Sequence, residues 1–306
     1  MRKELSQSLL QLAQTNNDFV FLTGDLGFMA FEELEKKLGE RFINMGISEQ
    51  NMMSVAATFA HDGLIPFVYS IAPFVVCRPF EQTRNEIGLH NKAVKIIANG
   101  GGYGYGIMGS THHCLEDIAL MRSIQNMKIF VPTFNDDVHE VIDMMVEDKH
   151  PNYLRLNNSQ QRPNEIENFK TFRQIRKGSS GVLIGIGPVI LNAVELNDAN
   201  KLDLDIWTIG MIPFGEFPKE LVQKINQIKK VVTIEEHYLA GGLSEMISNK
   251  ILKNNSIEKQ NIQFDSVYSN GYPSGNYGDQ KWHQEENSLA GKSLHQFLTN
   301  FLLEGI

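Results

Sequence analysis

A glutamate at the start of a predicted helix is the first residue whose position suggests chemistry. Glu49 lies in the segment 46–52, Gly-Ile-Ser-Glu-Gln-Asn-Met, after a short strand expected at 42–45 and before apolar residues at helical spacing. On position alone, we favour an acid that complements the helix dipole. A carboxyl among apolar neighbours would instead have a raised pKa and could share a proton with a ring nitrogen of a ligand. The local sequence does not decide between these interpretations.

A glycine-rich segment at 99–109 follows a predicted strand and holds Gly104, Gly106 and Gly109 in G-x-G-x-x-G spacing. This spacing is typical of dinucleotide-binding folds, which also need an acidic residue at the end of the next strand. The next predicted strand ends at Pro132 and has no such acid. We therefore predict a mobile, ligand-contacting loop at the carboxyl edge of a sheet.

Two adjacent histidines, His112 and His113, follow this loop. Adjacent side chains on one segment point apart and form no HExxH pattern, so we predict no metal site here. One of the two could act as an acid–base group, or could be a hydrogen-bonded loop histidine. Residue type alone leaves both possibilities open.

A third candidate segment follows the strand expected at 67–69. Phe74, Arg78, Phe80 and Gln82 are spaced to form a helix with a partly aromatic face. An aromatic stripe at this spacing is more often part of a core than a platform for a cofactor. The residues alone thus predict an α/β ligand-binding protein, and an enzyme is the favoured class.

The elements that must position these residues alternate along the whole chain. Apolar, β-rich runs precede helical periodicity or glycine-rich loops, as expected for parallel sheets with helices on both faces. A polar stretch interrupts the pattern after residue 156. We therefore predict a first α/β domain at 1–160, a linker at 161–177 and a smaller α/β domain at 178–306.

Composition excludes several classes of protein. The 306 residues include 28 Lys and Arg against 36 Asp and Glu, a net charge of −8 with no basic run, so we expect no nucleic-acid partner. No apolar stretch reaches the roughly 20 residues that a membrane span needs, and no signal peptide is recognisable. Cys77 and Cys114 lack metal-ligand spacing and suit a reducing compartment. We expect a cytoplasmic protein with buried thiols and no metal bound by this chain.

Taken in order, the motifs become specific. They are the segment 46–52, Arg-x-Phe-Glu-Gln at 78–82, the run from Thr111 to Arg122, and Asn-Met at 126–127 before Pro132. This set resembles the thiamine diphosphate enzymes of the transketolase family. The segment 231–243, with its Glu-Glu-His and Gly-Gly-Leu strings, resembles the C-terminal domain of that family. The resemblance covers nearly the whole chain, as a pyrimidine-binding domain followed by a transketolase C-terminal-like domain.

The resemblance implies two catalytic residues. Glu49 would hydrogen-bond the ring nitrogen of the cofactor's aminopyrimidine and favour its imino form, which a protonated or proton-sharing carboxyl does best. His112 matches a histidine that faces the substrate, where it would polarise a carbonyl or transfer protons.

The resemblance also implies a set of cofactor-binding residues. Besides Glu49, Phe74 would stack on the pyrimidine, Leu26 would line the cofactor near the thiazolium, and Arg78 and Gln82 would support this wall. No metal ligand is implied in this chain.

Half of the expected cofactor site is missing from the sequence. Members of the family bind the diphosphate through magnesium with a Gly-Asp-Gly motif, and this chain has none. The resemblance therefore implies the C-terminal subunit of a split enzyme, with thiamine diphosphate and magnesium held largely by an N-terminal partner subunit. Two copies of each chain are expected, with a dimer of this chain at the core.

The sequence departs from the family where sugar phosphates bind. Family residues that contact the substrate fall on Met29, Gly100, Met108 and Asn158, none of which can pair with a phosphate as arginine does. We therefore expect transfer of a ketol or acyl unit from a small keto donor to an aldehyde or keto acceptor, on substrates other than the standard pentose phosphates.

Two alternatives stay open. One is a beta-type subunit of a 2-oxoacid dehydrogenase or decarboxylase. The run from Thr111 to Arg122 favours the transketolase branch over this alternative. The other is a catalytically silent partner subunit, against which Glu49 and Phe74 speak.

Overall fold

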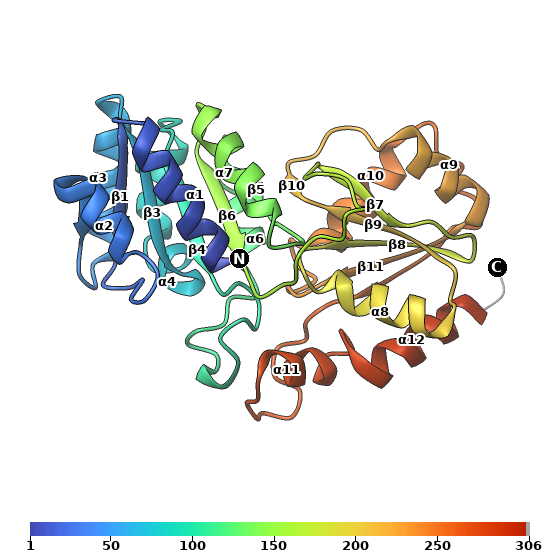
Figure 1. Ribbon diagram of the computed structural model, residues 1–306. Coiled ribbons are helices and arrows are strands. Elements are labelled where there is room, and N and C mark those ends of the chain that lie inside the picture. Colours follow the sequence, from blue (N-terminus) through green and yellow to red (C-terminus); the bar gives the residue numbers. More distant parts are fainter. Residues whose placement is uncertain (304–306) are drawn as a thin grey trace.

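Two open sheets lie side by side in the computed structural model, which describes residues 1–303 (Figure 1). The first unit is built on a seven-stranded sheet and the second on a five-stranded sheet. Helices cover both faces of each sheet, so the α/β class predicted from the sequence is confirmed. Within the described residues, no helix is long and apolar enough to cross a membrane.

The sheet of the first unit has the order β10-β5-β6-β4-β3-β1-β2. All neighbours pair in parallel except β10, which runs antiparallel to β5. The strands are β1 (Phe19–Thr23), β2 (Phe42–Asn44), β3 (Ile65–Ile71), β4 (Lys95–Asn99), β5 (Lys128–Phe130), β6 (Asn152–Leu156) and β10 (Met211–Ile212).

The two faces of this sheet are covered because both faces of its strands are apolar. On β1, Phe19 and Phe21 pack into one hydrophobic cluster and Val20 and Leu22 into another. One face carries α1 (Arg2–Thr15), α2 (Glu32–Leu38) and α7 (Asp137–Glu147), and the other carries α3 (Glu49–His61), α4 (Ala72–Val76) and α6 (Asp117–Arg122). Shorter helical turns are η1 (Gly39–Arg41), α5 (Phe80–Gln82), the π-helical η2 (Thr83–Gly88) and η3 (Gly106–Met108).

The second unit has the strand order β12-β11-β8-β9-β7, with β7 antiparallel to β9 and the remaining pairs parallel. Its strands are β7 (Phe172–Arg176), β8 (Gly181–Ile186), β9 (Leu204–Ile209), β11 (Lys230–Glu235) and β12 (Gln263–Val267). One face packs on α8 (Ile190–Asn200) and α12 (Gly291–Leu303), and the other on α9 (Lys219–Ile228) and α10 (Leu243–Lys253). The helix α11 (Gln280–Glu286) lies near the glycine-rich loop of the first unit (Figure 1).

The segment predicted as a linker, 161–177, contains a strand of the second sheet, β7. In return, β10 comes from the second half of the chain and pairs with β5 of the first sheet. Neither strand could be recognised from hydrophobicity. In β7, a buried arginine and partly exposed polar residues obscure the alternation of buried and partly exposed positions, and β10 is only two residues long. We propose that the second unit begins at β7, and that β10 is its contribution to the first sheet.

The single helix predicted through Phe74 and Gln82 is wrong. Helix α4 ends at Val76, and α5 begins only at Phe80. Pro79 lies between them; proline cannot donate a helical hydrogen bond and restricts the residue before it. The break leaves Cys77 and Arg78 exposed between two short helical turns.

A buried ion pair joins the two units. Arg173 on β7 donates from both terminal nitrogens to the carboxylate of Asp137 at the start of α7, at 2.8 and 2.6 Å. Both side chains are almost fully buried. The backbone N–H groups of Thr133 and Phe134 donate to the same carboxylate at 3.0 Å. Arg162 on the neighbouring segment donates to it as well, at 3.1 Å. Because this carboxylate has five donors and is shielded from water, removal of its charge leaves the buried Arg173 guanidinium without a counter-charge.

We predict that Asp137→Asn lowers the free energy of unfolding by about 3–5 kcal/mol, measured by urea denaturation. Asp198→Asn is the matched control, because Asp198 also accepts several hydrogen bonds from an arginine, Arg176, but at the surface. That substitution should cost less than about 1 kcal/mol. Equal losses in the two variants would contradict the role of burial.

Candidate functional site

The residues predicted to do chemistry lie at one edge of the first sheet. Strands β4, β3, β1 and β2 are neighbours and parallel, so the loops after them leave from the same edge. These loops carry, strand by strand, His112 after β4, Phe74 and Arg78 after β3, Leu26 after β1 and Glu49 after β2.

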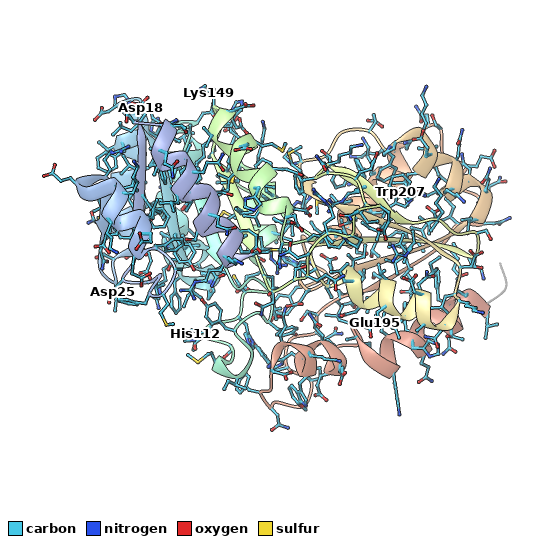
Figure 2. The ribbon with its side chains drawn as sticks, in the orientation of Figure 1. Asp18, Asp25, His112, Lys149, Glu195 and Trp207 are labelled. Carbon is cyan, nitrogen blue, oxygen red and sulfur yellow. The ribbon has the colours of Figure 1, made fainter. Side chains whose placement is uncertain are left out.

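Figure 2 shows two of these loops at that edge. Asp25, the neighbour of Leu26, and His112 both lie at the lower end of the first unit in this view. Asp18 and Lys149 lie at the opposite, upper end. The carboxyl edge of the sheet thus gathers loops from well-separated parts of the chain.

Glu49 is the first residue of α3 and is only 4% exposed. Its Oε1 accepts a hydrogen bond of 2.9 Å from Nη1 of Arg78. The loop after β1 approaches it closely, since a Cβ on Gly24 would lie 3.9 Å from the same oxygen. Glu49 therefore lies in the first turn of the helix, as expected of an acid that complements the helix dipole, and its interaction with a ligand stays a prediction.

Arg78 links Glu49 to an aromatic ring. Its guanidinium carbon lies 3.8 Å from the centroid of the Phe74 ring, while its Nη1 donates to Glu49. A flat group with N–H donors thus lies on Phe74 and bonds the buried acid. This is the arrangement that a flat heterocycle with ring nitrogens would need. The arginine side chain is 44% exposed, so solvent screens its ion pair with Glu49.

His112 also contacts the Phe74 ring. Its ring centroid lies 5.2 Å from that of Phe74 and 5.9 Å from that of Tyr105. Its Nδ1 hydrogen-bonds with the Thr111 hydroxyl at 2.9 Å. Tyr105 in turn accepts from Nδ2 of Asn99 at 2.9 Å. The histidine is therefore held by its neighbours, and within residues 1–303 its Nε2 makes no hydrogen bond.

Tyr105 was not singled out from the sequence. It lies inside the glycine-rich segment, which was interpreted from its glycine spacing alone. Its contact with His112 forms only because the loop folds back toward that residue. A large aromatic residue set among glycines is the signal that was present. Burial raises the pKa of Tyr105, so the hydroxyl stays protonated at neutral pH and can donate a hydrogen bond.

Four of the six predicted residues are therefore linked by contacts, in the order Glu49, Arg78, Phe74 and His112. Leu26 and Gln82 are outside this chain of contacts. The carbonyl of Leu26 accepts from the Thr23 hydroxyl at 2.8 Å, which shapes the turn after β1. Gln82 has a buried Oε1 that accepts no hydrogen bond from the described part of the chain.

The glycine-rich loop predicted to be mobile is tied down at several points. Gly102 and Cys114 exchange both backbone hydrogen bonds, at 2.7 and 3.0 Å. His113 bonds the Gly106 carbonyl through Nε2 at 2.7 Å, so this nitrogen carries the proton, and Nδ1 accepts from the Tyr272 hydroxyl at 2.9 Å. Of the two histidines, His113 thus holds the loop, whereas His112 contacts the rings of Phe74 and Tyr105.

The second unit holds this loop in place through hydrogen bonds to a buried carboxylate. Glu236, which is buried directly after β11, accepts from the backbone N–H of Tyr103 at 2.6 Å and from the side chains of Gln280 and Gln284. Burial raises the pKa of Glu236. A Cβ on Gly102 would lie 2.3 Å from this carboxyl, so only glycine allows the close approach.

The positions that depart from the family's sugar-phosphate contacts lie at the same edge or beside it. Met29 is 95% exposed and Met108 is 54% exposed. Asn158 donates weakly to Gln280 at 3.4 Å. Gly100 has a φ of 74° at the start of the glycine-rich loop, where a Cβ would strike the Tyr105 ring. None of these four side chains offers a cation to an anionic substrate.

Comparison with known proteins identifies the family. Residues 1–163 match the family model described as the pyrimidine-binding domain of transketolase. The chain belongs to the transketolase family. A putative transketolase C-terminal section from Methanocaldococcus jannaschii is 33% identical over 268 residues, which cover 83% of this chain and 82% of that one. One subunit of the apulose-4-phosphate transketolase of Phocaeicola vulgatus is 27% identical over 262 residues, covering 83% and 84%.

Solved structures in the transketolase family agree in fold. A split gene transketolase, solved as an inactive beta4 tetramer, has a TM-score of 0.78 at 27% identity over 98% of this chain and 97% of that one. A transketolase from Campylobacter jejuni, at 17% identity, shares the fold with a TM-score of 0.76. That match covers 97% of this chain but only 46% of the other. This chain thus resembles the C-terminal subunit of a split transketolase.

We predict that acid weakens the fold through His113. Burial lowers the pKa of His113 to about 4, so the folded chain resists a proton that the unfolded chain takes up near pH 6.5. The contribution is present above pH 6.5 and is lost as the pH falls toward 4, by up to about 3 kcal/mol. His113→Gln, which keeps an N–H donor for Gly106, should reduce this dependence in urea denaturation at pH 7, 6 and 5.

The control for this prediction is His90→Gln, because His90 is an exposed histidine on the first unit. It should retain the pH dependence of the wild-type chain. An unchanged slope in His113→Gln would assign the acid sensitivity to other buried groups.

Proposed function

We propose that this chain is the C-terminal subunit of a split, thiamine diphosphate-dependent transketolase, active only with an N-terminal partner subunit. The proposal rests on the contacts of Arg78 with both Glu49 and Phe74. They show that a flat group with N–H donors fits between this acid and this aromatic face. The aminopyrimidine of the cofactor is such a ring. Arg78 would give up these two contacts to the ring and would line its pocket.

Glu49 holds and exchanges a proton in this proposal. The cofactor, when bound, supplies a nucleophilic thiazolium carbon for cleavage and formation of carbon–carbon bonds. Glu49 would bond a ring nitrogen of the pyrimidine from its buried position, where little water competes for the shared proton. Phe74 would fix the orientation of the ring, and Leu26 and Gln82 would extend the wall of the pocket. Within residues 1–303, the Oε1 of Gln82 accepts no hydrogen bond, so it could accept one from the cofactor.

His112 acts on the substrate side. Thr111 and the rings of Phe74 and Tyr105 hold its imidazole next to the ring on which the cofactor would stack. From there it donates a hydrogen bond to the carbonyl of the keto donor and returns protons to the product. Tyr105 adds a neutral hydroxyl beside it, which suits recognition of hydroxyl groups on donor and acceptor.

A partner subunit is needed for two reasons. The chain has no Gly-Asp-Gly motif, so the diphosphate and its magnesium ion must be held elsewhere. The loops of the carboxyl edge also leave large apolar side chains in solvent, which a partner would cover. Those at least half exposed are Phe28, Met29, Ile47, Ile107 and Met108. The split gene transketolase solved as an inactive beta4 tetramer fits a C-terminal chain that self-associates but cannot act alone.

The donor and acceptor differ from the standard pentose phosphates in this proposal. Two relatives are named for apulose-4-phosphate, which makes specialised sugars the fitting substrate class. The absence of an arginine at Asn158 removes a bidentate partner for a phosphate. The neutral amide of Asn158 instead favours a substrate with hydroxyl groups at this point, or one whose charge lies elsewhere.

We expect Glu49→Gln to lower kcat for ketol transfer by the reconstituted complex by about 100-fold or more, because glutamine has the same size but cannot exchange a proton. Binding of thiamine diphosphate, measured by calorimetry, should change much less than the rate. Glu220→Gln is the matched control, since Glu220 is an exposed acid in the first turn of α9 in the second unit. An unchanged rate in Glu49→Gln would favour a catalytically silent subunit.

We expect the wild-type complex to use xylulose 5-phosphate and ribose 5-phosphate poorly. Asn158→Arg should raise kcat/KM for these substrates by roughly tenfold, since a charge-assisted bond to the phosphate is restored. Asn255→Arg, at an exposed position after α10, controls for the added charge. Robust turnover by the wild type would contradict the proposed substrate class, and reduction of lipoamide with a 2-oxoacid would indicate the dehydrogenase alternative.

A further inference from the structure

Three soft or anionic donor groups meet beside the cofactor wall. The sulfurs of Cys77 and Cys114 and a carboxylate oxygen of Glu116 all lie within 4.8 Å of one another. They come from two segments, one at the end of α4 and one directly after His113. Sequence spacing predicts no metal ligands here, because the segments meet only when the loops after β3 and β4 fold together.

Each donor is held by its own backbone or carboxylate contacts. The N–H of Cys77 donates to the Pro73 carbonyl at 2.9 Å, which closes α4. Cys114 is fixed by its double backbone bond with Gly102. One oxygen of Glu116 accepts from the Leu115 N–H at 2.7 Å, and the other points at the Cys77 sulfur at 3.9 Å. The group is therefore preorganised, with its ligands oriented by surrounding hydrogen bonds.

We propose that Cys77, Cys114 and Glu116 form a binding site for a thiophilic divalent cation such as zinc. Zinc prefers four ligands, and two thiolates with a carboxylate supply three, leaving a fourth position for water. Cys77 is exposed and gives the ion access, while Cys114 is buried and shields one side of the site. Small movements of the Cys77 and Glu116 side chains suffice to bring the three donors to coordination distance.

The charge state of the two thiols is suited to this role. The Cys114 thiol donates toward Cys77 and lowers the pKa of the Cys77 thiol, while the pKa of Cys114 is raised. Both sulfurs bind a cation as thiolates, so binding releases their protons to solvent, as is general for thiolate metal sites.

The site would connect the two halves of the proposed active site. Cys77 directly precedes Arg78 and follows Phe74 by about one helical turn, and Cys114 follows His112 by two residues. A bound cation cross-links these segments without touching Glu49 or the ring of Phe74. It therefore stabilises the loop geometry of the carboxyl edge and does not depend on whether the chain is catalytic.

The test is a titration of the full chain with Co²⁺ as a spectroscopic probe for zinc, in a thiol-free reductant and after both thiols have been counted as free. We expect a sulfur-to-cobalt charge-transfer band that saturates at one equivalent and is displaced by Zn²⁺. One equivalent of Zn²⁺ should also raise the melting temperature, because the ion binds only the folded site. Absence of the band with both thiols free would overturn the proposal.

Variants assign the ligands. Cys77→Ser should weaken binding by more than about 100-fold, beyond what the loss of an outer hydrogen bond costs, and Glu116→Gln should also weaken it. Both positions are at least partly exposed, so the fold tolerates these changes, which circular dichroism can check. Glu86→Gln, at a partly exposed acid in η2, should bind as the wild type does. Equal affinity in Cys77→Ser and the wild type would place the cobalt elsewhere.

Discussion

Parallel pairing of four neighbouring strands is the constraint from which the candidate site follows. Because β4, β3, β1 and β2 all run in one direction, every loop after them must leave from one edge of the sheet. The loops bring an acid, an aromatic ring and a histidine together from segments that are distant along the chain. Reversal of any one of these strands would carry its residue to the opposite edge, where Asp18 and Lys149 lie (Figure 2).

The second unit completes this edge without contributing to the sheet order there. Glu236 holds the backbone of the glycine-rich loop from beneath, and His113 holds the same loop at Gly106. The loop that presents His112 is therefore positioned by the fit between the two units as much as by its own sequence. A change in how the two units pack should therefore shift the position of His112 more than that of Glu49.

Features that depend on neighbouring residues along the chain could be predicted from the sequence. The start of α3 at Glu49 and the apolar strands follow from periodicity along the chain. The contact of Arg78 with Phe74 agrees with their helical spacing, but the hydrogen bond from Arg78 to Glu49 could not be predicted, because it joins the segments that follow two different strands. The approach of Cys77 to Cys114 could not be predicted either, since it requires the loops of two neighbouring strands to pack together. The short strand β10 carries too few residues to show alternation.

That short strand has a consequence for how the molecule can be divided. Since β10 covers the outer edge of β5, a piece of chain that stopped at the end of the first unit would leave β5 with unpaired backbone groups facing solvent. An open edge of this kind recruits strands from other molecules. The two units are therefore expressed most safely as a single polypeptide, and a split within a larger enzyme is better tolerated before the first unit than between these two.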